Sequence, residues 1–106
     1  MKRFKVKIYP EAIADIQNIT DWYNEKQAGL GKKFQETTVR QINQLSKIPF
    51  SFVIRYSKIR CMLIKKFPYM VHFHIDETNS IVEVLAVIST DRNPEYWQAS
   101  TGRITI

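Results

Sequence analysis

The residues best suited to chemistry are three cations and a tyrosine in the second half of the chain. Arg60, Lys65 and Arg92 could hold the oxygens of a phosphate group, because fixed cations stabilise the charge that develops when a phosphodiester is cleaved. Tyr96 could stack on a base or transfer a proton, and it could equally pack against the core. With Lys66 as an alternative to Lys65, these residues form the candidate catalytic site of a metal-independent ribonuclease.

Two histidines provide a second candidate. His72 and His74 are two residues apart, which places both imidazole rings on one side of a β-strand. They could act as acid and base near neutral pH. They could also bind a metal together with Asp76, which would point to the same side of the strand. We expect a solvated sheet face instead. We predict neither a metal nor a cofactor, because the sequence has no phosphate-binding loop and no dinucleotide-binding glycine motif. The single Cys61, inside an apolar run, is expected to be a buried free thiol.

The charge balance indicates an anionic partner. Sixteen Lys and Arg residues against ten Asp and Glu residues give a net charge of +6. This excess is typical of a protein that binds nucleic acid, a ribosome or an acidic protein segment. The cations concentrate in two stretches that contain no acid, residues 2–7 and residues 55–66.

The length of 106 residues predicts one domain that covers residues 1–106, with residues 98–106 as a flexible tail. The sequence has no apolar run of the ~18 residues that span a membrane. It also lacks the apolar segment of a signal peptide behind its basic first residues. We therefore expect a cytoplasmic protein without a membrane partner.

The first half of the chain predicts a strand followed by two helices. Residues 3–8 alternate between cationic and apolar side chains, as in a half-buried strand. Pro10 begins a helix whose apolar side chains recur at helical spacing, and a second helix is predicted over residues 32–47, before Pro49. The break at residues 29–31 is short, so the two helices should form an antiparallel hairpin.

The second half predicts strands over residues 52–56, 59–66, 69–75 and 81–88. The expected fold class is α+β, in the order β-α-α-β-β-β-β. A helical hairpin should pack on one face of a twisted, mainly antiparallel sheet of four to five strands. The other face should stay open, and Arg60, Lys66, His72 and His74 could project there, although sequence alone does not fix the register.

The order of these elements, together with four short motifs, resembles the RelE/ParE superfamily of toxins. The resemblance covers residues 3–97, and its specificity comes from the order of the motifs: Arg60, Phe67-Pro68-Tyr69, Val84-Leu85-Ala86-Val87 and Arg92-Asn93-Pro94-Glu95-Tyr96-Trp97. It implies the toxin of a type II toxin–antitoxin system, silenced by a cognate antitoxin protein in a hetero-oligomer. It also implies one of two targets, which are cleavage of mRNA on the ribosome for RelE-like members and inhibition of DNA gyrase for ParE-like members.

The resemblance gives a mixed account of the candidate site. It puts Tyr96 at the place of the catalytic tyrosine of RelE-like members, but Thr90 where those enzymes have a key arginine. Arg92, two positions later, could replace that arginine. Ser89 stands where many relatives carry histidine. Both targets stay open, as do a degenerate toxin and a non-toxic module that binds nucleic acid or another protein.

The antitoxin is expected on the open cationic face of the sheet. Met62 and Met70 should add apolar contacts there, and an acidic amphipathic segment suits such a surface.

Overall fold

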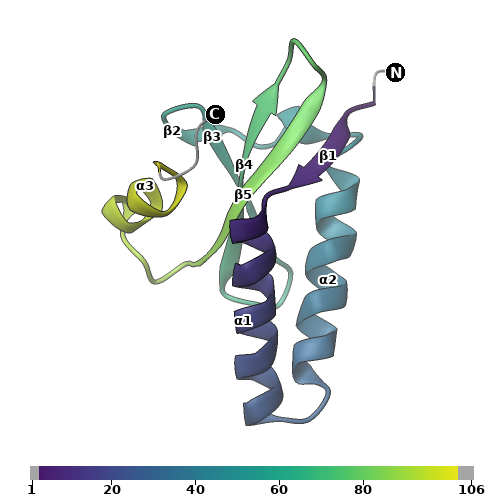
Figure 1. Ribbon diagram of the computed structural model, residues 1–106, viewed down its shortest axis with the longest axis vertical. Coiled ribbons are helices and arrows are strands. Elements are labelled where there is room, and N and C mark those ends of the chain that lie inside the picture. Colours follow the sequence, from purple (N-terminus) through teal and green to yellow (C-terminus); the bar gives the residue numbers. More distant parts are fainter. Residues whose placement is uncertain (1–2, 103–106) are drawn as a thin grey trace.

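The computed structural model describes residues 3–102 and contains five strands, three α-helices and one short 3-10 helix (Figure 1). In chain order these are β1 (Lys5–Ile8), α1 (Pro10–Lys26), α2 (Leu30–Gln44), the 3-10 helix Pro49–Ser51, β2 (Ile54–Tyr56), β3 (Ile59–Leu63), β4 (Tyr69–Asp76), β5 (Ile81–Ser89) and α3 (Pro94–Gly102). The predicted order of strands and helices is confirmed, with one helix added at the end.

The five strands form one mixed sheet in the order β1-β5-β4-β3-β2. The pairs β2–β3, β3–β4 and β4–β5 are antiparallel, whereas β1 pairs with β5 in parallel, with Val6 opposite Val82. The predicted α+β class and the mainly antiparallel sheet are therefore confirmed. Two edges result, β1 on one side and the three-residue β2 on the other.

The helical hairpin of α1 and α2 packs on one face of this sheet and closes the main core. Ala12 and Ile16 of α1, and Phe34 and Ile42 of α2, lie at helical spacing and are buried. From the sheet they meet a large set of apolar side chains that includes Val71, Phe73, Val82 and Val84. Burial of each large apolar side chain contributes roughly 1.5–3 kcal/mol, so this layer holds the helices on the sheet.

Two glycines allow the helices to turn and approach each other closely. Gly29 has a φ of 87°, a left-handed conformation that favours glycine, and it precedes the first residue of α2. Gly31 lies against α1, where its amide donates a 2.8 Å hydrogen bond to Asn24 Oδ1. A Cβ atom at position 31 would lie 2.1 Å from the carbonyl oxygen of Thr20. The close approach of the two helices therefore depends on a residue without a side chain.

The opposite face of the sheet is not as open as expected, because α3 packs on it. Trp97 is buried among Cys61, Met70, Ala86 and Ile88, so this tryptophan folds back on the sheet. The predicted flexible tail began at residue 98, but residues 98–102 form the second half of α3. Residues 103–106 of that tail lie outside the described residues.

The register separates residues that were expected to share the open face. Arg60 pairs with Phe73 and Met62 with Val71, so both side chains lie on the face that carries the helical hairpin. His72 does lie on the other face, but it is completely buried, so the expectation of a solvated histidine there is wrong. The physical reason is the cover provided by α3, which the sequence pattern did not reveal.

We predict that Gly31→Ala destabilises the fold by roughly 1–3 kcal/mol, because the added methyl group must displace the α1 backbone at Thr20. Gly102→Ala is the matched control, since a Cβ atom there meets nothing within 4 Å. Chemical denaturation followed by circular dichroism measures both. A Gly31→Ala protein as stable as the Gly102→Ala protein would contradict the close approach.

Candidate functional site

Arg92 and Tyr96 lie together where the chain passes from β5 into α3. The Arg92 guanidinium stands over the Tyr96 ring, 4.6 Å from its centroid. Asn93 Oδ1 accepts a 3.0 Å hydrogen bond from the amide of Tyr96 and so caps the first turn of α3. Both side chains line a hollow of about 300 Å³ beside Asp15, whose Oδ2 accepts a hydrogen bond from the amide of Val87. This pair is the part of the predicted catalytic set that the structure brings together.

Arg60 lies in a different place, near the end of the sheet that carries the β2–β3 turn. Its guanidinium donates a hydrogen bond to the carbonyl oxygen of Phe52 and lies 5.1 Å from the centre of the Phe50 ring. It lines a hollow of about 450 Å³ together with Lys58 and His74. One of its five N–H donors is thus directed to the backbone.

Lys65 and Lys66 lie in a third place, in the connection between β3 and β4. They line a hollow of about 580 Å³ whose other wall is α2. This hollow shares no lining residue with the two that contain Arg60 and Arg92. The four residues predicted to form one catalytic site therefore line three separate hollows.

His72 takes part in a chain of hydrogen bonds beneath α3. Thr101 Oγ1 donates to the carbonyl of Trp97 at 2.9 Å, so it accepts from the Tyr56 hydroxyl, 3.1 Å away. The Tyr56 oxygen then accepts from Nδ1 of His72 at 2.9 Å. This direction fixes the proton of the neutral ring on Nδ1, and it ties β4, β2 and α3 to one another.

The titratable groups in and beside this hydrogen-bonded network have pKa values that favour their neutral forms. Burial, with a smaller contribution from Arg55, lowers the pKa of His72 to about 4. Burial also raises the pKa of Tyr56 to about 12 and that of Cys61 to about 11. Cys61, predicted as a buried free thiol, is buried and free, and its Sγ lies 3.4 Å from His72 Nδ1. These groups stabilise the packing of α3 and present neither a thiolate nor an imidazolium at neutral pH.

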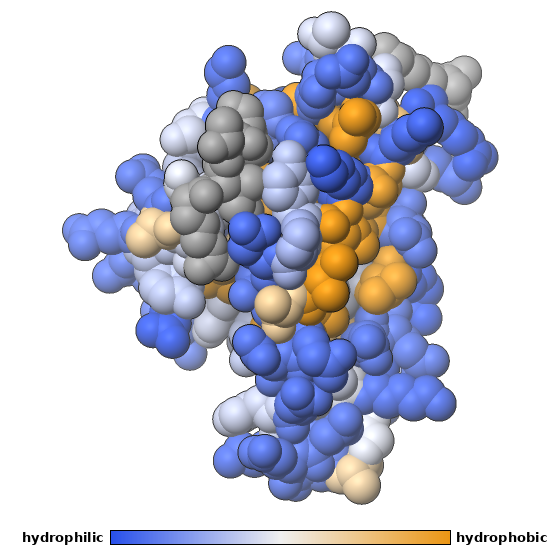
Figure 2. Space-filling view, in the orientation of Figure 1, coloured by the Kyte–Doolittle hydropathy of each residue, from blue (hydrophilic) through white to orange (hydrophobic). Residues whose placement is uncertain are grey.

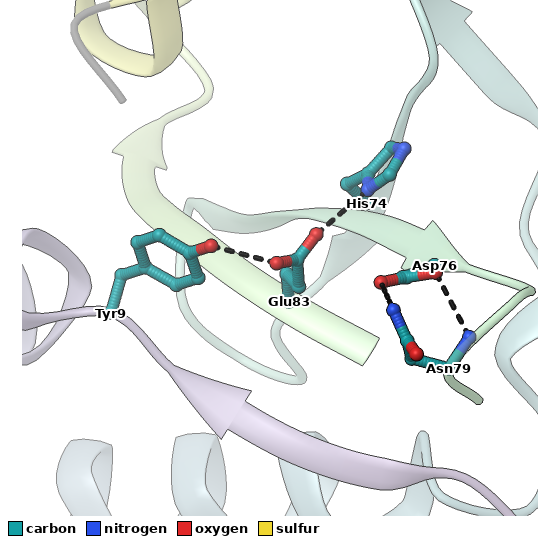
Figure 3. A network of polar contacts seen from close by, with 5 residues as sticks. All are labelled: Tyr9, His74, Asp76, Asn79 and Glu83. Atoms are coloured by element: carbon teal, nitrogen blue, oxygen red, sulfur yellow. Dashed lines mark hydrogen bonds and ion pairs between the residues drawn. The ribbon is translucent and has the colours of Figure 1, made fainter. Parts of the chain in front are cut away.

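His74 belongs to a more accessible network that sequence reasoning missed (Figure 3). Glu83 of β5 accepts a 2.7 Å hydrogen bond from the Tyr9 hydroxyl and lies 2.9 Å from Nδ1 of His74. The hydrogen bond to Glu83 is the main reason that the pKa of Tyr9 is raised to about 12. The sequence feature that could have indicated this network is Glu83, a charged residue inside the otherwise largely apolar strand β5. In the same view, the carboxylate of Asp76 accepts two hydrogen bonds from Asn79 in the β4–β5 turn.

The described residues contain no group of three or more His, Cys, Asp or Glu side chains that could hold a metal ion. Asp76 is directed to Asn79, so it does not complete a ligand set with His72 and His74.

The sequence model of the ParE toxin of the type II toxin–antitoxin system parDE matches residues 6–94. This match spans most of the chain, from β1 to the first residue of α3. The chain belongs to the ParE toxin family. It is therefore a toxin-type protein of the RelE/ParE superfamily, as its motifs had indicated.

Solved structures agree with this assignment at the level of the fold. The chromosomal ParDE toxin–antitoxin system of P. aeruginosa matches with a TM-score of 0.73 at 16% identity, covering 82% of this chain and 96% of that one. A free arginine-to-alanine mutant of E. coli toxin RelE gives 0.69 at 13% identity, covering 99% and 100%. The archaeal RelE–RelB complex of P. horikoshii gives 0.58 at 13% identity, covering 86% and 99%. No curated protein sequence matches significantly.

Within this ParE-family chain, Thr90 lies in the exposed turn after β5 and Ser89 ends that strand. The amide of Thr90 donates to the carbonyl oxygen of Pro68, which fixes the turn against the β3–β4 connection. Along the described part of the chain, no helix is long and apolar enough to cross a membrane.

We predict that His72 makes this ParE-family protein less stable in weak acid. Because its folded-state pKa lies below the unfolded value, the unfolded chain binds the proton first. The contribution of neutral His72 to the free energy of unfolding is therefore fully present above about pH 6.5, and it is lost as the pH drops toward 4. Between pH 7 and pH 5 this histidine should cost about 2 kcal/mol of unfolding free energy.

Urea denaturation at the two pH values measures this cost. His72→Gln should lose about 2 kcal/mol less than the wild type over this interval, because glutamine keeps a donor for Tyr56 and does not titrate. An equal pH dependence in the wild type and in His72→Gln would show that His72 is not the responsible group.

Proposed function

We propose that this chain is a growth-inhibiting toxin that acts by binding DNA gyrase rather than by cleaving mRNA, and that a cognate antitoxin silences it. The observation that carries the proposal is the dispersal of the candidate catalytic residues, because Arg60, Lys65 and Arg92 line three separate hollows. A metal-independent ribonuclease needs its cations around one phosphate. An inhibitor that acts by binding needs no such convergence. The match to the ParE toxin family supports the same choice.

A specific observation keeps ribosome-dependent mRNA cleavage as the second candidate. Arg92 and Tyr96 are in contact, and together they could bind a phosphate and transfer a proton. In this alternative Arg92 supplies the positive charge at the site, since position 90 is threonine.

The antitoxin proposal rests on the solved relatives and on an exposed apolar edge. The ParDE system and the RelE–RelB structure are toxin–antitoxin assemblies. In this chain β2 is the last strand of the sheet, and Val53 and Ile54 beside and within it are 71% and 51% exposed. Unpaired strand edges accept an added strand, and exposed apolar residues there provide side-chain contacts. We place the antitoxin contact at this edge instead of on the sheet face that α3 covers.

We expect that induction of this chain alone in bacterial cells stops DNA synthesis before protein synthesis. Pulse-labelling of new DNA and new protein in the minutes after induction measures the order. Arg92→Ala and Tyr96→Phe should keep growth inhibition to within about threefold. A ribonuclease that uses Arg92 would instead lose about 10²–10³ in rate.

Early arrest of translation, with loss of toxicity in Arg92→Ala, would reject the gyrase proposal in favour of mRNA cleavage. Growth that is unaffected at verified soluble expression would reject toxicity itself. In that case a degenerate toxin or a non-toxic binding module becomes the better description.

We also expect the chain to co-purify with the product of a neighbouring gene, and Ile54→Lys to weaken that complex at least roughly tenfold, the equivalent of about 1.4 kcal/mol. The lysine places a charge in the apolar part of the proposed contact. Ile13→Lys is the matched control, because Ile13 is 55% exposed on α1, and α1 packs against β5, which lies three strands from β2 in the sheet. Isothermal titration of the purified proteins measures both. Equal weakening by the two variants would refute the β2 contact.

A further inference from the structure

A basic groove lies between α2 and the connection that joins β3 to β4. Lys33 and Arg40 of α2 line one wall, and Lys65 and Lys66 line the other. All four side chains are exposed. Along residues 3–102, none of them forms an ion pair with a carboxylate, although Glu36 lines the same groove. Four cations and one acid thus give the lining of the groove an excess of positive charge.

The two walls are held rigidly together by one buried side chain. Gln41 of α2 accepts a 2.8 Å hydrogen bond from the amide of Lys65 through its Oε1. Its Nε2 donates a 3.0 Å hydrogen bond to the carbonyl oxygen of Leu63, so both ends of the amide are used. Lys66 follows in a left-handed conformation with a φ of 69°, which turns the chain sharply beside α2. The lysines are therefore presented by a fixed turn and not by a loose loop.

The spacing of the cations suits a polymer of phosphates better than a single anion. Lys33 and Arg40 are seven residues apart, which is about 10.5 Å along a helix axis at 1.5 Å per residue. In a B-DNA duplex, the phosphates of one strand advance by roughly 3.4 Å per nucleotide along the helix axis. An α2 wall aligned with that axis therefore spans about three nucleotides, with Lys65 and Lys66 opposite.

The apolar part of the groove offers little to a protein partner. Leu30 and Phe67 also line it, but both are partly buried. The Phe67 ring is engaged with Tyr23 and Phe34 at 5.2 Å in each case. On the face seen in Figure 2, the end of the hairpin that carries the α1–α2 turn is also hydrophilic. Protein interfaces depend on buried apolar anchors, whereas nucleic-acid interfaces are polar and positive.

We propose that this groove binds the phosphodiester backbone of a nucleic acid, without reading its sequence. The site is separate from the Arg92–Tyr96 hollow and from the β2 edge, and it requires no catalytic activity. Such binding would bring the toxin to nucleic acid before or while it engages its target. The proposal goes beyond growth inhibition and is tested on the purified chain alone, so it stands or fails independently of toxicity.

The test is fluorescence anisotropy of the full-length chain with a labelled 20-base-pair DNA duplex and a labelled single-stranded RNA, over 50–200 mM salt. Lys33→Gln/Arg40→Gln removes two groove cations at exposed helical positions. We expect the negative slope of log K against log salt to become shallower by about two. The Kd for the duplex at 0.1 M salt should rise roughly tenfold or more. The two probes show whether a duplex or a single strand is preferred.

Lys5→Gln/Lys32→Gln is the matched control, because it removes the same charge from exposed positions that do not line the groove. It should keep a slope within about half a unit of the wild type. Thermal melting confirms that both double variants fold. If the two variants weaken binding equally, net charge rather than the groove is responsible and the proposal is wrong. Binding of poly-glutamate but of neither nucleic acid would likewise overturn it and assign the groove to an acidic protein.

Discussion

Strand β5 is covered on both faces, and the positions of the other elements depend on this double burial. Val82 and Val84 face the helical hairpin, whereas Ala86 and Ile88 face α3. Leu85 is an extra residue opposite β4, between the pairs His72–Ala86 and Phe73–Val84. Such a bulge bends a strand and re-aims its side chains. Because β1 and β4 both pair with β5, a change in its register would move every surface on the molecule.

Two polar networks flank this strand and behave differently because their solvent exposure differs. In the network from His72 through Tyr56 to Thr101, the two end members are buried and Tyr56 is partly buried, and burial holds His72 in its neutral form. In that setting hydrogen bonds specify one arrangement of α3 on the sheet. Tyr9, Glu83 and His74 are only partly buried, so their network remains accessible to solvent. The first network is structural, whereas the second presents ionisable groups at the surface.

The fold distributes its positive charge over several surfaces instead of concentrating it in one. Arg60 is used to bind a backbone carbonyl, Arg92 stands over an aromatic ring, and Lys65 and Lys66 face α2. Dispersed cations suit association with large anionic surfaces, where each contact adds a modest, salt-dependent contribution. They do not suit stabilisation of one transition state. This is the physical reason that we propose binding rather than cleavage.

The sequence by itself determined the order of strands and helices and the helical hairpin, because periodicity, glycine and proline act locally. It also carried the motifs of the RelE/ParE superfamily. It did not determine which face of the sheet each side chain occupies, so Arg60 and Met62 were misplaced and His72 was expected in water. Register and the docking of α3 were decided only by tertiary structure. Both depend on contacts between residues far apart in the chain, such as Tyr56 with Thr101, which no local pattern encodes.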